Sequence, residues 1–138
     1  MVASRGRVTW VRAVSPLHLI CEESLGALNA RRAADGKPPV PMDRFRPNLV
    51  VSGCPRPHAE DSWRSVTIGG LTLAVTSPCP RCTVPDVQQT SGRVDMREVG
   101  PMKSLRDYRQ RPGMGTVFGI YLRPSAAGAV RVGDAVSA

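Results

Sequence analysis

Aromatic residues are scarce in this chain of 138 residues, where they make up 4% of the sequence. Lysine is also rare, because it occurs only at Lys37 and Lys103. Proteins that bind single-stranded nucleic acid stack bases on aromatic rings along a basic groove. No basic run in this chain is interleaved with such rings, so we expect no nucleic-acid partner.

Long apolar runs are missing as well. Polar and charged residues such as Arg5, Arg12 and His18 interrupt the first part of the chain before any apolar run reaches the length of a signal peptide or a membrane helix. We therefore expect a cytoplasmic protein with no membrane partner. In a reducing compartment the four cysteines are expected to be free thiols, metal ligands or catalytic groups rather than disulfides.

What the chain has in excess is arginine. Of 19 basic residues two are lysine, so 17 are arginine, and the net charge is +8. The planar guanidinium group binds phosphate through two parallel hydrogen bonds, which favours an anionic partner. The alternative is the composition of GC-rich coding DNA, which produces much Arg, Ala, Gly and Pro. The length fits one compact domain that needs no disulfide or metal to fold.

Short runs with strand-like patterns outnumber the helical ones. The polarity of the charges and the spacing of apolar residues predict helices over residues 22–32 and 101–109, with a loop at 33–39 between the first helix and the next strand. Strands are expected at 48–51, at 66–68 and 71–75 as a hairpin around Gly69-Gly70, at 117–122, and as a last hairpin-like pair within 129–136. We expect a mainly β protein with a few helices, arranged as a barrel or sandwich.

The pair Cys79 and Cys82 is the strongest chemical signal in the sequence. The strand before it is expected to end at Ser77-Pro78, because proline lacks the N–H donor that a sheet needs, so residues 79–82 should form a turn. A zinc site is disfavoured because the other candidate ligands form no second closely spaced pair; they are Cys21, Cys54, His18 and His58. A thioredoxin-like pair is disfavoured because Pro85 opposes a helix after the pair.

One reactive thiolate at Cys82 is favoured, because the neighbouring cation Arg81 stabilises its charged form. The alternative is that both cysteines are small buried apolar residues, as free cysteines often are.

Two further segments carry candidate groups. Residues 44–48, Arg-Phe-Arg-Pro-Asn, join two guanidinium groups to an amide before a strand, which suits a phosphate or a heterocycle, although a solvated loop is the alternative. Glu60 and Asp61 could act as paired carboxylates, or could belong to a capped turn anchored by Trp63. Neither His18 nor His58 lies in a known hydrolase motif, so a hydrolytic triad is not expected.

Taken in order along the chain, these segments resemble the MOSC domain family, and within it the mitochondrial amidoxime-reducing component and its bacterial relatives. The resemblance runs from about Ser15 to Val136. The motifs that carry it are RFRPNLVVSGC at 44–54, AEDSW at 59–63, CPRC at 79–82, LRDYR at 105–109, VFGIY at 117–121 and VGDAV at 132–136.

The resemblance implies a β-barrel-like MOSC domain over residues 15–138 that binds the pterin-based molybdenum cofactor, with residues 1–14 as an N-terminal remnant. It makes Cys82, the second cysteine of the pair, the catalytic molybdenum ligand. The cofactor contacts that it implies, by position, are Ser15, Arg46, Asn48, Pro80, Arg81 and Tyr121. A thiolate suits molybdenum as a soft ligand, and guanidinium and amide groups suit the phosphate and pterin edges of a cofactor.

The activity implied is reduction of small N-hydroxylated compounds, with electrons from a ferredoxin, a flavoprotein or a cytochrome b5-like protein. Other MOSC domains belong to cofactor sulfurases, which implies as alternatives a sulfur carrier with a persulfide on Cys82 or a truncated, inactive fragment. The family is also linked to pyridoxal phosphate. Two departures stand out: Val14 replaces a threonine of the reductase-type relatives, and only a dozen or so residues precede Ser15, where those relatives carry a further barrel.

Overall fold

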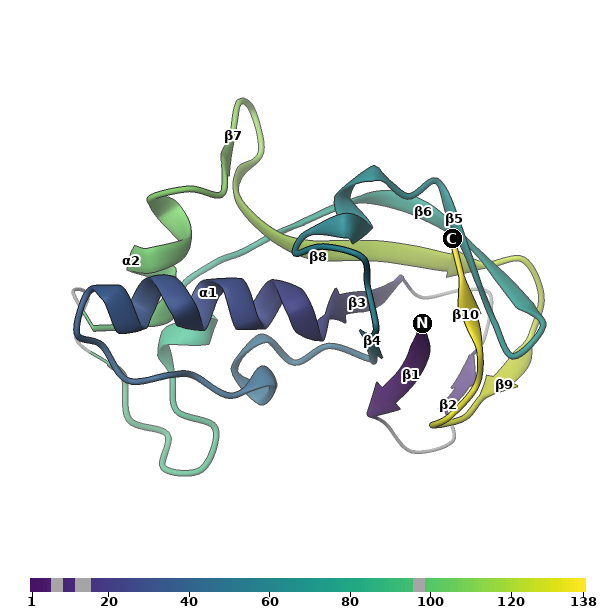
Figure 1. Ribbon diagram of the computed structural model, residues 1–138, viewed down its shortest axis with the longest axis horizontal. Helices are drawn as coiled ribbons and strands as arrows, with labels where there is room; N and C mark the ends of the chain where they lie inside the picture. Colours follow the sequence, from purple (N-terminus) through teal and green to yellow (C-terminus); the bar gives the residue numbers. More distant parts are fainter. Residues whose placement is uncertain (6–8, 12–15, 96–98) are drawn as a thin grey trace.

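The computed structural model describes residues 1–5, 9–11, 16–95 and 99–138 (Figure 1). The strands are β1 (Val2–Arg5), β2 (Thr9–Val11), β3 (Leu17–Cys21), β4 (Leu49–Ser52), β5 (Ser65–Ile68), β6 (Leu71–Pro80), β7 (Gln110–Arg111), β8 (Gly115–Pro124), β9 (Gly128–Val130) and β10 (Val136–Ser137). The α-helices are α1 (Glu22–Ala34) and α2 (Pro101–Arg106), and the short 3₁₀ helices are η1 (Met42–Phe45), η2 (Ala59–Ser62) and η3 (Val84–Asp86).

The main sheet closes on itself almost completely. Its strands follow the order β1-β4-β3-β8-β6-β5-β10, with β7 added to β8 and with only β3 and β4 parallel. The first and last strands then meet, because Ala3 donates its N–H to the carbonyl of Asp134 at 3.0 Å and Val136 donates to that of Met1 at 2.9 Å. These contacts cover the outer edge of β1, which would otherwise be exposed. The expectation of a mainly β, barrel-like domain with a few helices is confirmed.

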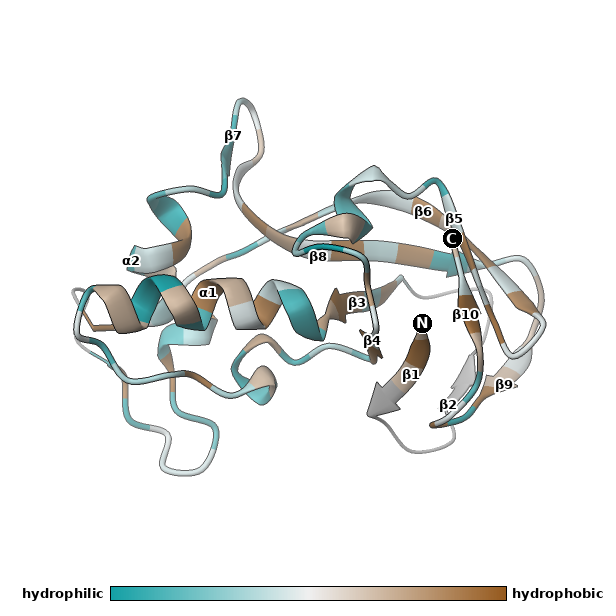
Figure 2. Cartoon of the chain, viewed as in Figure 1, coloured by the Kyte–Doolittle hydropathy of each residue, from teal (hydrophilic) through white to brown (hydrophobic). Residues whose placement is uncertain are grey.

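The sheet is buried on both faces where β3, β4 and β8 meet. Leu19, Val51 and Leu122 face the interior of the barrel, whereas Ile20 and Phe118 face a second apolar core beneath the helices. A strand covered on both faces is expected to be apolar along its whole length rather than alternating. Figure 2 accordingly shows β3 and β4 as largely hydrophobic, while α1 alternates along its length.

Helix α1 connects the parallel strands β3 and β4, as a parallel pair requires a long crossover. Its first turn carries Glu22 and Glu23 and its last turn Arg31 and Arg32, which suits the helix dipole. Leu28 packs into the second core. The helix predicted over residues 22–32 is confirmed, and no helix among the described residues has the length and apolar character needed to cross a bilayer.

The predicted hairpin of residues 66–75 is confirmed, but its second strand is longer than predicted. Strand β6 runs past Pro78 to Pro80, with Pro78 paired to Ile120 of β8 and Pro80 to Val117. The prediction that residues 79–82 form a turn is therefore wrong for Cys79 and Pro80, which both lie in the strand. Two register shifts, after Val75 and after Pro78, place irregularities around the prolines, where a sheet tolerates a missing donor.

The C-terminal hairpin-like pair predicted within residues 129–136 is also wrong. Strands β9 and β10 form there, but β9 pairs with β2 and β10 pairs with β5. Local alternation identified the strands, while their partners come from distant parts of the chain. The helix predicted over 101–109 is confirmed in its first part only, because α2 ends at Arg106.

Candidate functional site

The two cysteines of the Cys-Pro-Arg-Cys motif lie in different surroundings. Cys79, in β6, is fully buried, whereas Cys82, two residues beyond the end of the strand, is exposed. Strand geometry accounts for this difference, since Cys79 faces the covered side of β6 and the chain leaves the sheet after Pro80. Cys82 is thus the thiol of this pair that a molecule in solution can reach.

Arg81 ties the segment between these cysteines to two other elements. Its backbone N–H donates to the carbonyl of Thr116 at 2.8 Å, and its Nη2 donates to the carbonyl of Phe45 at 2.9 Å. Its Nη1 lies 3.2 Å from the sulfur of Cys79. The guanidinium carbon also lies 5.7 Å from the centre of the Phe45 ring. These contacts fix the side chain in place, while its buried Nε has no hydrogen-bond partner among the described residues.

His18 lies beside these groups, although its position in the sequence gave no sign of a role. It pairs with Tyr121 across β3 and β8, and the two rings are 5.9 Å apart. Its Nε2 is 3.1 Å from the carbonyl of Phe118. Burial and, next, the positive charge of Arg81 lower the pKa of His18 to about 4, so the ring is neutral at pH 7. No signal in the sequence pointed to it, because the register that pairs His18 with Tyr121 is set by the fold.

Asn48 is held by the backbone of His18 through two hydrogen bonds. The backbone N–H of Asn48 donates to the carbonyl of His18 at 2.8 Å, and the N–H of His18 donates to Oδ1 of Asn48 at 2.8 Å. The side-chain oxygen is therefore occupied inside the protein. Since the residue is exposed, its amide NH₂ remains as the group that could bind a ligand.

Arg46 adopts a backbone conformation that residues other than glycine rarely take. Its φ is 52° and its ψ is 48°, in the left-handed region, at the end of η1. Such residues cluster where a chain is held for binding, because the conformation costs energy. The turn leaves the Arg46 side chain exposed, and a cavity of about 380 Å³ lies against it, lined also by Met42, Asp43, Pro47, Val50 and Gln89.

Tyr121 completes the group on β8. A hydrogen bond with Cys79 is the main cause that raises the pKa of its hydroxyl, and burial adds to it. Tyr121 therefore lies close to the buried cysteine of the motif. The structure thus brings together Arg81 and Tyr121 with His18, Asn48 and the backbone of Arg46.

Two of the remaining predicted contacts are less defined. Pro80 is exposed at the end of β6, next to Arg81 and Cys82. Ser15 and Val14 both lie outside the described residues. The cofactor contact of Ser15 and the effect of valine at position 14 therefore stay predictions.

Glu60 and Asp61 do not form a catalytic pair. Glu60 is fully buried and accepts hydrogen bonds from the Ser24 hydroxyl at 2.7 and 2.9 Å, and burial raises its pKa. Asp61 binds Arg109 at 2.7 Å and Arg111 at 2.9 Å. Burial acts to raise the pKa of Asp61, but these arginines outweigh it and lower the pKa below its usual value. Both carboxyl groups are thus engaged by other side chains of the protein, and neither caps η2.

The geometry can be compared with the demands of a pterin cofactor that carries a metal. An exposed thiol could ligate a soft metal, while Arg46 and the unpaired Nε–H of Arg81 are donors for phosphate or ring acceptors. The amide NH₂ of Asn48 is a further donor for the same phosphate and ring acceptors. The residues present therefore fit such a group.

Comparison with known proteins agrees with the motifs in the sequence. Residues 10–137 match the MOSC domain. The chain is 38% identical over 129 residues to "Mitochondrial amidoxime reducing component 2" of Rattus norvegicus, an alignment that covers 88% of this chain and 36% of the relative. It is 40% identical over 111 residues to "Molybdenum cofactor sulfurase" of Oryza sativa subsp. japonica, covering 77% of this chain and 13% of that protein. The chain thus spans about a third of the first relative and less of the second.

A solved structure shares the fold. The crystal structure of YiiM from Geobacillus stearothermophilus superimposes with a TM-score of 0.55 at 15% identity, over 87% of this chain and 52% of the other. With the match to the family over almost the whole chain, the resemblance seen in the sequence is confirmed. This chain belongs to the MOSC domain family.

Proposed function

We propose that this chain is a molybdenum cofactor-binding oxidoreductase that reduces N-hydroxylated compounds, with Cys82 as the ligand of the metal. The observation that supports it most is the unequal exposure of the two cysteines. Cys79 is buried beneath Arg81, while Cys82 is exposed at the end of β6. A metal ligand must be reachable by the incoming cofactor, and Cys82 meets that condition.

The remaining residues have roles that follow from their contacts. Arg81 is held by the carbonyls of Phe45 and Thr116, so its side chain would lose little freedom on binding the cofactor. Arg46 and the amide of Asn48 would bind phosphate and ring atoms of the cofactor. His18, neutral at pH 7, would position Asn48 and Tyr121 without adding charge.

The bound cofactor would supply the two-electron chemistry. Reduction of an amidoxime or hydroxylamine breaks its N–O bond, consumes two electrons and two protons, and releases water. An electron-transfer protein, such as a ferredoxin, a flavoprotein or a cytochrome b5-like protein, would deliver the electrons. We expect this reaction in the cytoplasm, on small molecules.

The metal content of the purified protein tests the proposal. We expect molybdenum in the wild-type protein after expression in a cell that makes the cofactor, and more than about tenfold less in Cys82→Ser, since loss of a ligand costs more than the loss of an outer-shell contact. Cys54→Ser, which removes a thiol elsewhere, should retain the metal. Equal molybdenum in wild type and Cys82→Ser would refute the assignment of Cys82.

The exposed thiol also suits a second function, in which Cys82 carries a persulfide and no redox turnover occurs. The neighbouring Arg81 would stabilise the anionic persulfide, as it would a thiolate. Mass spectrometry after incubation with a cysteine desulfurase distinguishes the two functions. One added sulfur on Cys82, together with no bound molybdenum, would favour the carrier over the reductase.

A further inference from the structure

The second pair of cysteines, Cys21 and Cys54, lies on the other side of β3 from the helices. Cys21 ends β3 and precedes α1, and Cys54 follows β4 after Gly53. Strands β3 and β4 are parallel neighbours, with Cys21 opposite Val51. The parallel pairing therefore brings two cysteines together that are 33 positions apart in the sequence.

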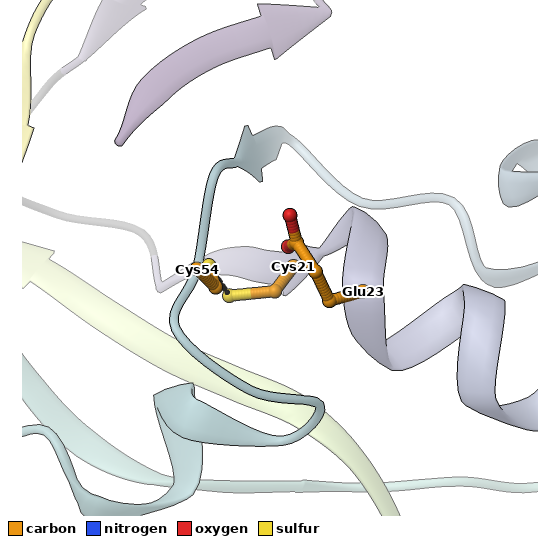
Figure 3. A group of neighbouring side chains, drawn as sticks. All are labelled: Cys21, Glu23 and Cys54. Carbon is orange, nitrogen blue, oxygen red and sulfur yellow. Dashed lines mark hydrogen bonds between the residues drawn. The ribbon is translucent and has the colours of Figure 1, made fainter.

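The sulfur atoms of these cysteines are in direct contact. The thiol of Cys54 donates to the sulfur of Cys21 over 2.6 Å, and Figure 3 shows the two sulfurs facing one another beside Glu23 of α1. The bond in a disulfide is about 2.05 Å long, so the pair is within a short side-chain adjustment of bonding. Cys21 is 0% exposed and Cys54 8% exposed, which keeps the pair away from bulk solvent.

The surroundings disfavour negative charge on either sulfur. Glu60 accepts a hydrogen bond from the backbone N–H of Cys21 at 3.3 Å, and Glu23 accepts one from Gly53 at 2.8 Å. Burial and Glu60 raise the pKa of Cys21 well above its usual range, and burial raises the pKa of Cys54 to about 11. A disulfide is neutral and titrates no further, so it suits this acidic and buried place better than two thiolates.

A metal ion is the competing occupant, because Cys21, Glu23 and Cys54 have ligand atoms within 4.8 Å of one another. Metal binding requires both thiols to be deprotonated. Zinc also lies about 2.3 Å from each sulfur in a tetrahedral site, which holds two sulfurs more than about 3.5 Å apart. The observed contact is much shorter, and this favours the disulfide.

We propose that Cys21 and Cys54 form an intramolecular disulfide when the protein meets a peroxide. Cys54 has the lower pKa of the two and is the more exposed, so it loses its proton first, and its thiolate takes one oxygen atom from hydrogen peroxide. A sulfenic acid forms, and the other oxygen leaves as water with the proton from the thiol. The Cys21 sulfur then bonds to the Cys54 sulfur, and the sulfenic oxygen leaves with both protons as a second water. Two electrons pass from the two thiols to the peroxide. In the structure both cysteines are free thiols, as the sequence predicts, so the disulfide is the oxidised state of this pair.

The bond would lock the crossover between β3 and β4. The loop between Cys21 and Cys54 would contain α1, η1 and the turn that follows η1. Arg46 and Asn48 in that turn belong to the proposed cofactor site. Because the link restricts the unfolded chain, oxidation should raise the melting temperature by about 10 °C for a loop of this length. A thiol reductant should reverse the rise.

The full chain carrying Cys82→Ser is the protein to test, because the exposed Cys82 would otherwise form intermolecular disulfides. It is treated with hydrogen peroxide, denatured, alkylated and digested, and the tryptic peptides that carry Cys21 and Cys54 are analysed by mass spectrometry. We expect these two peptides to be cross-linked, and the melting temperature to rise. Cys21→Ser and Cys54→Ser in the same background serve as matched controls and should show neither change.

Several results decide the matter. If both thiols remain fully alkylated after oxidation, the proposal is wrong. It is also wrong if added zinc protects both thiols from alkylation in the folded protein at one ion per chain, since the pair would then be a metal site. If a serine variant fails to fold, the cross-linked peptide in the parent protein still decides the question. Cross-linking without a rise in melting temperature would overturn the proposed locking of the crossover.

Discussion

At the scale of single residues, His18 shows how one buried residue holds its neighbours through both its backbone and its ring. Its backbone fixes the amide of Asn48, its ring lies against Tyr121, and its Nε2 is near the carbonyl of Phe118. A neutral imidazole can do this next to Arg81 without charge repulsion. Protonation of His18 would therefore disturb the group around Arg81.

His18 should make the protein less stable in mild acid. Its pKa is about 4 in the folded protein and about 6.5 in the unfolded chain, so the unfolded state binds the extra proton as the pH falls through that window. Between pH 7 and pH 5 we expect His18 to cost about 2 kcal/mol of unfolding free energy. Urea unfolding of wild type and His18→Gln at the two pH values measures this difference.

The comparison isolates His18 because the other buried groups are shared by both proteins. His58 acts in the same direction, since burial lowers its pKa to about 4. Glu60 acts in the opposite direction, because burial raises its pKa and stability then falls as the pH rises. An identical loss in wild type and His18→Gln would contradict the assignment.

The sequence identified most exposed site residues but not the buried ones that hold them. Cys82, Arg46 and Arg81 belong to motifs that stand out by residue type. His18 does not, because its role depends on burial and on a partner in another strand, and spacing along the chain carries no information about either. Cys79 belongs to the same motif as Cys82, but its burial could not be predicted from the spacing.

At the scale of elements, the close approach of β3 and β8 depends on Gly119. This residue, within β8, has a φ of +76°, a conformation that favours glycine. A β-carbon there would lie 2.5 Å from the carbonyl oxygen of Leu19 and 2.6 Å from Nε2 of His18. The bare backbone of Gly119 thus makes room for the His18 ring.

Gly119→Ala should destabilise the protein by roughly 3 kcal/mol, from the left-handed backbone and from overpacking together. Gly113→Ala is the matched control, because its φ is +72° but no atom lies within 4 Å of the new β-carbon. The control should lose only the backbone part, about 1 to 2 kcal/mol. Chemical denaturation of both variants tests the close approach, which equal losses would contradict.

Element boundaries were predictable where the pattern is local. Gly69-Gly70 marked the hairpin of β5 and β6, and the charges of α1 marked its ends. Pro78 gave the wrong end for β6. Proline opposes a strand in isolation, but pairing with β8 extends β6 to Pro80. Such pairing is a tertiary effect that overrides local preference.

At the scale of the whole molecule, the positive charge bears on the proposed electron donor. The net charge is +8, and a charge of one sign speeds the encounter with a partner of the other sign. The charge was clear from composition, but its meaning was not, since GC-rich coding gives the same excess of arginine.

If an acidic ferredoxin or flavoprotein is the donor, the electron-transfer rate should fall at least about tenfold between low salt and about 0.5 M salt, because ions screen the attraction. Stopped-flow measurement of cofactor reduction at a series of salt concentrations tests this. A neutral donor of similar potential is the control and should show little change. An unchanged rate with the acidic donor would mean that charge does not steer the encounter.

The closure of the barrel has a consequence for how the chain is made. Strand β1 pairs with β4, but its other edge pairs with residues 133–136, which follow about 130 residues later. During synthesis that edge stays open until these residues have emerged from the ribosome. An unpaired strand edge is where nascent chains associate wrongly, so this barrel is exposed to aggregation, and to capture by chaperones, throughout the translation of the residues between them.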